Sequence, residues 1–306
     1  MNKYVIYTAV IGNYDKILQP KVVDPLFDYI LFSDDISKKS IGIWQVRKIG
    51  YHNKDQIKIA RWVKTHPEKL LSEYEFSVWM DANVQIQTDF IYKRTKELFD
   101  NRIPISSIIH PDRNCIYQEI FAVFILRYET TDTIVRWSKI LQKENFPHNK
   151  GLNETNIVFR NHNCTEIEKI DSLWWNFIEQ YSRRDQFSFN YVLWKLQISC
   201  TPLLPPNESA RNSKHFNLII HTNPQAKVCS NKENFSWLQH YCVLYPNEQD
   251  KIKNIFFKIT QKEHSALWLR IYGLKYRIII YLKRLQNLIN RVISLFTNSP
   301  STKTQL

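Results

Sequence analysis

The sequence predicts an α/β protein in which a β-sheet is flanked by helices, and two observations support this class. Apolar runs typical of buried strands alternate between residues 4 and 204 with segments of helical periodicity. Polar residues follow several of these runs directly, as expected where strands end at the carboxyl edge of such a sheet and form a site there. The clearest example is the apolar run Phe76–Met80, which Asp81 follows.

The alternation assigns each element to a range. The expected strands are Tyr4–Ile11, Tyr29–Phe32, Trp44–Ile49, Phe76–Met80, Ile103–Ile109, Asn156–Phe159, Ile198–Leu204 and Leu218–His221. The expected helices are 53–66, Phe90–Phe99, Tyr117–Leu126, Ser172–Tyr181 and Asp185–Lys195. The first of these helices has Asn53 as its N-cap and ends before Pro67, which disfavours helical geometry at the residue before it. We expect one domain over residues 1–245 and a helical tail over 246–306.

Composition excludes several classes of protein. The chain of 306 residues contains only five glycines and has neither G-x-G-x-x-G nor G-x-x-x-x-G-K-[ST], so a dinucleotide-binding Rossmann enzyme and a P-loop nucleotidase are disfavoured. Its five cysteines include no C-x-x-C pair, which indicates neither a zinc site nor a disulfide framework. The N-terminus lacks the layout of a signal peptide, and we expect a cytoplasmic setting.

The net charge of +13 is concentrated near the C-terminus. No acidic residue follows Glu263, whereas seven basic residues do, and four arginines recur every seven residues from Arg270 to Arg291. This pattern predicts a basic amphipathic helix that attaches to anionic lipid at the inner face of the cell membrane. A terminal helix packed on the domain, or a dimer seam, is the alternative. No nucleic-acid-binding motif is present, and no nucleic acid is expected as a partner.

The segment after Phe76–Met80 is the strongest candidate site. Side chains two residues apart on an extended segment point to the same side, so Asp81 and Asn83 are expected to face one site together. Carboxylate and amide oxygens suit Mg²⁺ or Mn²⁺, ions that proteins often share with substrate phosphates. His221, at the end of a later apolar run, is a third candidate ligand. The plainer interpretation of this segment is a strand end capped by an Asx turn.

Other polar segments have both a functional and an ordinary interpretation. Lys58, Arg61 and Lys64 form one basic ridge on the 53–66 helix, which suits a diphosphate or a solvated face. Segments 110–113 and 151–154 suit a site rim and an acceptor pocket, or ordinary turns. Asp185 and Gln186 suit sugar hydroxyls, and Asp185 also suits a capping box with Ser182.

Together these segments resemble a glycosyltransferase-like domain family, long listed as of unknown function, that includes plant pollen-tube turgor and seed-mucilage proteins and bacterial surface-polysaccharide proteins. The matching stretches keep their order over roughly residues 4–195. They are Thr8–Asp15; Lys58 with Arg61, Lys64 and His66-Pro67; Ser77–Asn83; His110–Arg113 with Cys115, Tyr117 and Glu119; Gly151-Leu152; Trp174-Trp175; and Arg184–Phe189. The layout is also distantly similar to glycogenin-like transferases.

The resemblance implies a GT-A-type fold, with a mixed, mostly parallel sheet flanked by helices. It also implies the transfer of a sugar from a nucleotide-sugar donor, UDP-linked, to a surface-polysaccharide acceptor such as a glycan or glycolipid. Asp81, Asn83 and His221 would hold Mn²⁺ or Mg²⁺, although Asn83 is a weaker ligand than the aspartate usual there. The implied catalytic residues are Asp81, Asp185 and Gln186. The donor-binding set is Thr8, Gly12, Asn13, Tyr14, Asp34, Asp35, Lys58, Arg61, Lys64 and Ala82, and a further substrate-binding set on the acceptor side or near phosphate is His110, Arg113, Gly151, Leu152, Arg184 and Lys227. An inactive, membrane-associated glycan- or protein-binding subunit is the alternative.

Overall fold

The structure is a computed structural model that describes residues 3–12, 14–126 and 128–222, together with positions 278, 282, 285, 286 and 289. The expected tail therefore lies largely outside the described residues, as do Asn13 and Lys227. Among the described residues, no helix is both long enough and apolar enough to cross a bilayer.

An eight-stranded mixed sheet organises the described part of the chain, in the order β3-β4-β2-β1-β5-β8-β7-β9. Its strands are β1 (Tyr4–Ala9), β2 (Phe27–Phe32), β3 (Ser40–Ile41), β4 (Trp44–Arg47), β5 (Phe76–Met80), β7 (Ile105–Ile109), β8 (Asn153–Asn161) and β9 (Thr201–Pro202). The neighbours β4, β2, β1 and β5 are all parallel, whereas β8 is antiparallel to both β5 and β7. The carboxyl ends of four adjacent strands therefore meet at one edge of the sheet.

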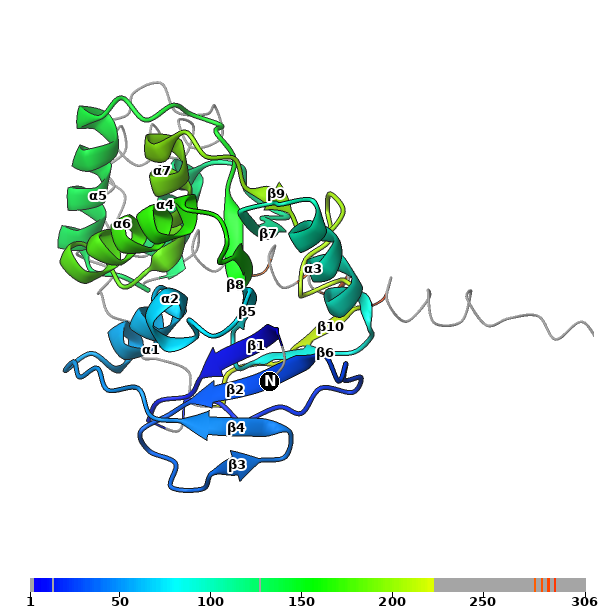
Figure 1. The fold of residues 1–306 in the computed structure, drawn as a ribbon. Helices are drawn as coiled ribbons and strands as arrows, with labels where there is room; N and C mark the ends of the chain where they lie inside the picture. The colour runs from blue at the N-terminus through cyan, green and yellow to red at the C-terminus, as the bar shows by residue number, and fades with distance from the viewer. Residues whose placement is uncertain are drawn as a thin grey trace, which may run out of the picture.

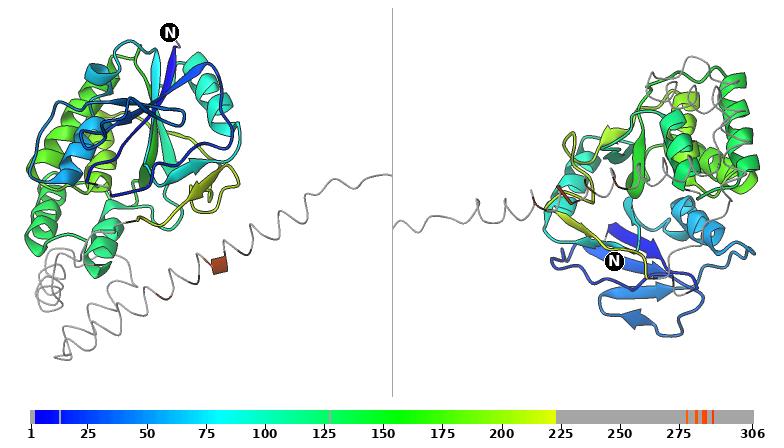
Figure 2. Two further views of the ribbon diagram at one scale, coloured as in Figure 1. Left: turned by 90° about the horizontal axis from the view of Figure 1, so that it is seen from below. Right: turned by 180° about the vertical axis from the view of Figure 1, so that it is seen from behind.

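Helices cover the two faces of this sheet unequally (Figure 1). The described helices are α1 (Gln56–Lys64), α2 (Pro67–Leu70), α3 (Phe90–Asp100), α4 (Ile116–Leu126), α5 (Thr131–Lys143), α6 (Glu166–Gln180) and α7 (Asp185–Leu196). Figure 2 shows α3 on one face and the other helices on the opposite face. A two-stranded sheet of β6 (Val84–Ile86) and β10 (Phe216–Leu218) lies on the α3 side, where β6 follows β5 after a short turn.

Two apolar clusters fill the space between the layers. Strands β1 and β5 are almost wholly buried, which explains why both are continuous apolar runs and do not alternate. Their side chains alternate between the clusters: Tyr7 and Trp79 pack toward α1 and α6, while Ile6 and Val78 pack toward α3. One buried ion pair, Arg160–Asp171, crosses the first cluster with nitrogen and oxygen 2.8 Å apart.

The predicted α/β class is confirmed, and several boundaries change. The N-cap of α1 is Asp55, whose Oδ1 accepts from the Ile57 amide, while Asn53 orders the preceding turn by accepting from the Asp55 amide. Helix α5 is absent from the prediction, although Thr130 caps it in the usual way. The predicted strand Ile198–Leu204 shortens to β9. The bounds predicted for the last strand, Leu218–His221, are wrong, because β10 covers Phe216–Leu218 and ends before His221.

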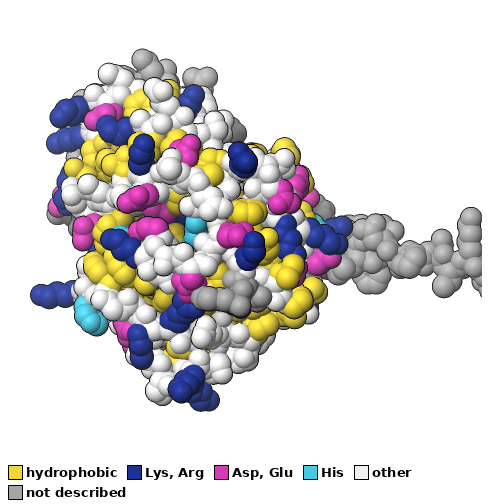
Figure 3. Space-filling model, in the orientation of Figure 1, with side chains coloured by type: hydrophobic (Ala, Val, Ile, Leu, Met, Phe, Trp, Pro, Cys, Tyr) yellow, Lys and Arg dark blue, Asp and Glu magenta, His cyan; other side chains and the backbone are white. Residues whose placement is uncertain are grey.

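Charges on the body of the protein are mixed. On the face shown in Figure 3, acidic and basic side chains are interspersed over the described residues, with no broad region of a single sign. This distribution agrees with the sequence, in which much of the basic excess follows Glu263.

Candidate functional site

A cavity of about 160 Å³ opens at the carboxyl edge of the parallel strands, between the ends of β1 and β5 and helix α1. Polar and charged side chains make up much of its wall, together with apolar residues from β1 and α1. It is lined by Ala9, Val10, Ile11, Tyr14, Asp15, Gln56, Ile57, Ala60, Arg61, Trp79, Asp81, Ala82, Arg183, Arg184 and His221. A cavity therefore lies at the end of β5, where the sequence predicts a site.

Asp81 is oriented by groups on its own strand and on α1. The indole Nε1 of Trp79, two residues earlier on the same side of β5, donates to Asp81 Oδ1 at 2.7 Å. Arg61 Nη1 and Lys64 Nζ lie 3.9 and 3.8 Å from the same oxygen. The carboxylate is one-quarter exposed, so it is fixed in direction and still accessible from the cavity.

Lys64 is fully buried directly behind Asp81. Its ammonium group donates to Asp185 Oδ2 at 2.5 Å and lies 5.5 Å from the ring centre of Trp79. Asp185 also accepts from Thr155 Oγ1 at 2.9 Å and pairs with Arg61 Nε at 3.4 Å. Burial alone would raise the pKa of Asp185, but Arg61 and then Lys64 outweigh it and hold that pKa below its usual value. Asp185 is therefore held as an anion by its contacts with Arg61 and Lys64.

A second wall of the cavity comes from two segments far apart in sequence. The Nδ1 atom of His221 lies 2.9 Å from Asp15 Oδ2, and the Thr222 amide donates to the other carboxylate oxygen at 3.3 Å. The His221 ring lies 4.7 Å from that of Tyr14. These contacts bring the predicted His221 to the same cavity as Asp81.

Several predicted donor-binding residues serve other partners. The Gly12 amide donates to Asp35, and Asp34 accepts from the Ile49 amide, so both carboxylates order the loops beside the cavity. Lys58 donates to the Glu179 carbonyl at the end of α6. Thr8 is buried and lines a much smaller void on the other side of Asp81. The prediction of a shared surface ridge is therefore wrong, because Lys58, Arg61 and Lys64 end in three different environments.

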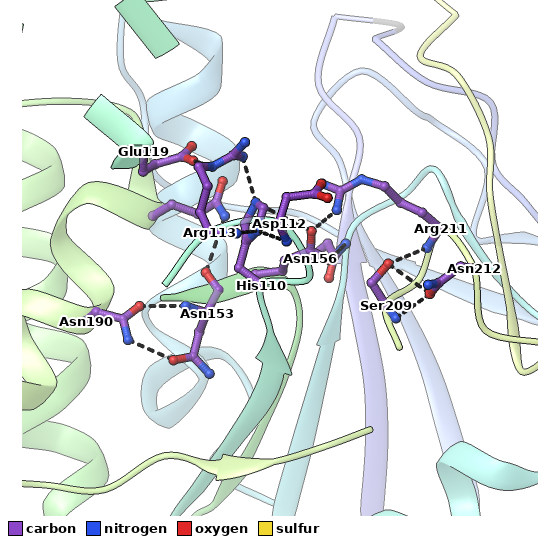
Figure 4. A network of polar contacts seen from close by, with 12 residues as sticks. His110, Asp112, Arg113, Glu119, Asn153, Asn156, Asn190, Ser209, Arg211 and Asn212 are labelled. Carbon is purple, nitrogen blue, oxygen red and sulfur yellow. Dashed lines mark hydrogen bonds and ion pairs between the residues drawn. The ribbon is translucent and has the colours of Figure 1, made fainter. Parts of the chain in front are cut away.

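The predicted acceptor-side residues divide in the same way. Arg184 lines the cavity, whereas Gln186, predicted to be catalytic, donates to the Asn153 carbonyl. His110 and Arg113 belong to a separate network in which Arg113 pairs with Glu119 at 2.7 Å (Figure 4). Gly151 and Leu152 support that network through backbone bonds: Gly151 donates to the Asn114 carbonyl, and the His110 amide donates to the Leu152 carbonyl. Neither they nor His110 and Arg113 line the cavity.

Asn83 departs most clearly from the prediction. The chain turns after Met80, where the Val84 amide donates to the Asp81 carbonyl at 2.9 Å, so residues 81–83 are not extended. The side-chain amide of Asn83 donates to the Ile219 carbonyl at 2.9 Å, and Asn83 is absent from the cavity wall. The prediction that Asp81 and Asn83 face one site together is therefore wrong, because side-chain alternation needs an extended segment.

The described residues offer a divalent ion an incomplete set of ligands. No group of three His, Cys, Asp or Glu side chains among them is arranged to hold a metal. Asp15 and His221 bind each other, which leaves Asp81 as the accessible carboxylate. One carboxylate together with substrate phosphate oxygens is a common arrangement for Mg²⁺, so the donor set fits an ion that arrives with a diphosphate.

Several residues of the cavity are absent from the predicted site sets, and Trp79, Asp15 and Arg183 are three of them. Trp79 had a usable signal, because it lies two residues before Asp81 on the same side of a strand. Asp15 ends the Thr8–Asp15 stretch that supports the family resemblance. Arg183 was indistinguishable from a surface residue; in the structure it lines the cavity 3.4 Å from Asp55, the N-cap of α1.

Comparisons with known proteins identify the class. Residues 1–205 match the model of the TOD1/MUCI70 glycosyltransferase-like domain, and the chain belongs to this family. No curated protein matches the sequence significantly. Among solved structures, it is similar to the apo structure of the WbbM bifunctional glycosyltransferase, with 13% identity and a TM-score of 0.38 over 67% of this chain. The match spans 38% of the length of that protein.

Proposed function

We propose that this protein has a GT-A-type fold and transfers a sugar from a nucleotide-sugar donor, most simply a UDP-sugar, to a glycan or glycolipid acceptor of a surface polysaccharide. One observation supports this most strongly: an accessible carboxylate, Asp81, and three arginines, Arg61, Arg183 and Arg184, line one cavity at the carboxyl edge of the sheet. This combination suits a diphosphate, because arginines pair with phosphate oxygens in two-pronged hydrogen bonds.

The residues of the cavity would have distinct roles. The arginines would bind the diphosphate and stabilise the charge that develops on the leaving nucleotide. The apolar wall from Val10, Ile11 and Ile57 would receive the flat face of the base. A bound Mn²⁺ or Mg²⁺, held by Asp81 and phosphate oxygens, would supply further neutralisation of charge. Lys64 and Asp185 would keep Asp81 and Arg61 in place from behind.

The C-terminal basic helix remains a proposal based on the sequence. No acidic residue follows Glu263, and a positively charged amphipathic helix favours anionic lipid surfaces. Such attachment would keep the enzyme on the inner face of the cell membrane, beside a lipid-linked acceptor.

A panel of nucleotide sugars tests the proposed activity. UDP-, GDP-, dTDP- and ADP-linked sugars would each be added with Mn²⁺, with Mg²⁺ or with EDTA, while unfolding temperature and release of nucleotide are measured. We expect the nucleotide sugars of one base to raise the unfolding temperature, since a ligand at one hundred times its Kd stabilises the folded protein by about 2.7 kcal/mol. We also expect slow hydrolysis of that donor to release its nucleotide. If a nucleotide sugar raises the unfolding temperature but no nucleotide is released with any acceptor, the result would support the inactive binding subunit. No stabilisation by any member would contradict both.

A further inference from the structure

We propose that Asn83 is a positioning residue: its side-chain amide holds the segment that carries His221 against the cavity, and it does not ligate an ion there. The inference takes from the proposed function only the identity of the ligand used as a probe. The position of His221 can be measured without that ligand.

The turn after β5 directs consecutive side chains to different places. Asp81 and Ala82 line the cavity. Asn83 is 8% exposed and faces the chain beyond β10. A ligand of an ion in the cavity would need its oxygen on the side of Asp81, and the turn removes Asn83 from that side.

Asn83 holds Ile219 through two of its polar groups, the backbone carbonyl and the side-chain NH2. The Ile219 amide donates to the Asn83 carbonyl at 2.8 Å, and the Asn83 side chain donates to the Ile219 carbonyl at 2.9 Å. The first bond continues the β6–β10 pairing, in which Leu218 lies opposite Val84. The second bond is added by the side chain alone, at the point where the regular pairing ends.

His221 lies two residues beyond this double contact. On its far side, His221 and Thr222 both bind Asp15. The short segment 219–222 is therefore fastened at one end by Asn83 and at the other by Asp15. Ile220, between the two, is 88% exposed and supplies no packing of its own. The two polar anchors, together with contact between the His221 and Tyr14 rings, determine where the imidazole ring lies.

The chemistry of the anchor requires an amide. A buried carbonyl oxygen accepts hydrogen bonds and cannot donate one, so its partner must carry a proton. An ionised aspartate at position 83 would place a negative charge against the Ile219 carbonyl and lose the bond. A metal-binding role would instead favour aspartate at position 83, because a carboxylate binds Mn²⁺ or Mg²⁺ better than an amide does. The variant Asn83→Asp therefore separates the two roles.

The experiment compares Asn83→Asp and Asn83→Ala with the wild type. The ring nitrogens of His221 are followed by NMR, with their signals assigned by their loss in His221→Gln, and the Kd values for Mn²⁺ and for UDP with Mn²⁺ are measured by calorimetry. Asn101→Asp serves as the matched control, because the Asn101 amide also donates to a backbone carbonyl, that of Glu97, away from the cavity.

We expect both Asn83 variants to change the His221 nitrogen signals. Both should also raise the Kd for UDP roughly tenfold, which corresponds to the loss of one hydrogen bond. Asn83→Asp should bind UDP and Mn²⁺ no more tightly than Asn83→Ala does. Asn101→Asp should match the wild type in both readouts. Tighter Mn²⁺ binding by Asn83→Asp, or His221 signals unchanged in both Asn83 variants, would overturn the proposal. If the wild type fails to bind UDP, the proposed UDP-linked donor is wrong, and the His221 signals still decide the role of Asn83.

Discussion

Replacing Asp81 by asparagine should reduce sugar transfer by roughly 100-fold or more, as expected when a preorganised charge at the reacting centre is lost. Asparagine keeps the shape of the side chain and can still accept from the Trp79 indole, which lies 2.7 Å away in the wild type. The effect should therefore appear in the rate and not in folding. Transfer would be measured with the donor identified by the nucleotide-sugar panel, alongside the unfolding temperature.

The matched control is Asp89→Asn, which removes a carboxylate that is half exposed and pairs with Lys93 on the surface. Its transfer rate should equal that of the wild type. Near-normal turnover by Asp81→Asn would remove Asp81 from the mechanism, and loss of folding in that variant would show that its contribution is structural.

Replacing Lys64 by methionine should destabilise the protein by about 3–5 kcal/mol, the cost of removing one partner from a buried ion pair. The change leaves Asp185 buried with Arg61 and Thr155 but without its shortest contact, and it leaves Asp81 with one fewer cation nearby. Unfolding in urea measures the effect. Lys93→Met, which disrupts an exposed pair on α3, should cost well under 1 kcal/mol.

The same ion pair has a defined pH dependence. Because Arg61 and Lys64 lower the pKa of Asp185 below its usual 3.8 despite its burial, the stabilisation is present above pH 3.8 and is lost as the pH falls below it. The stability difference between the wild type and Lys64→Met should accordingly shrink in acid. A Lys64→Met variant within 1 kcal/mol of the wild type at neutral pH would contradict the assigned role.

The sequence located the centre of the site because that inference needed only local information. An apolar run that ends in a carboxylate marks the carboxyl end of a buried strand, and Asp81 lies there. His221 was placed by the same reasoning and lines the same cavity. Their proximity follows from the antiparallel pairing of β10, which ends shortly before His221, with β6, which begins shortly after Asp81.

Other features depend on partners that the sequence does not reveal. Asn83 reads as part of a metal pair until its contact with Ile219, 136 residues away, is known. Lys64 reads as a surface cation, although α6 and α7 pack over it and bury it completely. The strand β8 gives no sign of its direction, because only the path of the preceding connection makes it antiparallel to β5.

Titration of UDP and of uridine into the wild-type protein by calorimetry tests most directly whether the cavity binds a diphosphate. UDP should bind at least tenfold more tightly than uridine. The double variant Arg183→Gln/Arg184→Gln should narrow this difference while it still binds uridine, since guanidinium–phosphate pairs supply the additional affinity. Equal affinities for UDP and uridine in the wild type, or unchanged UDP affinity in the double variant, would contradict the proposed diphosphate site.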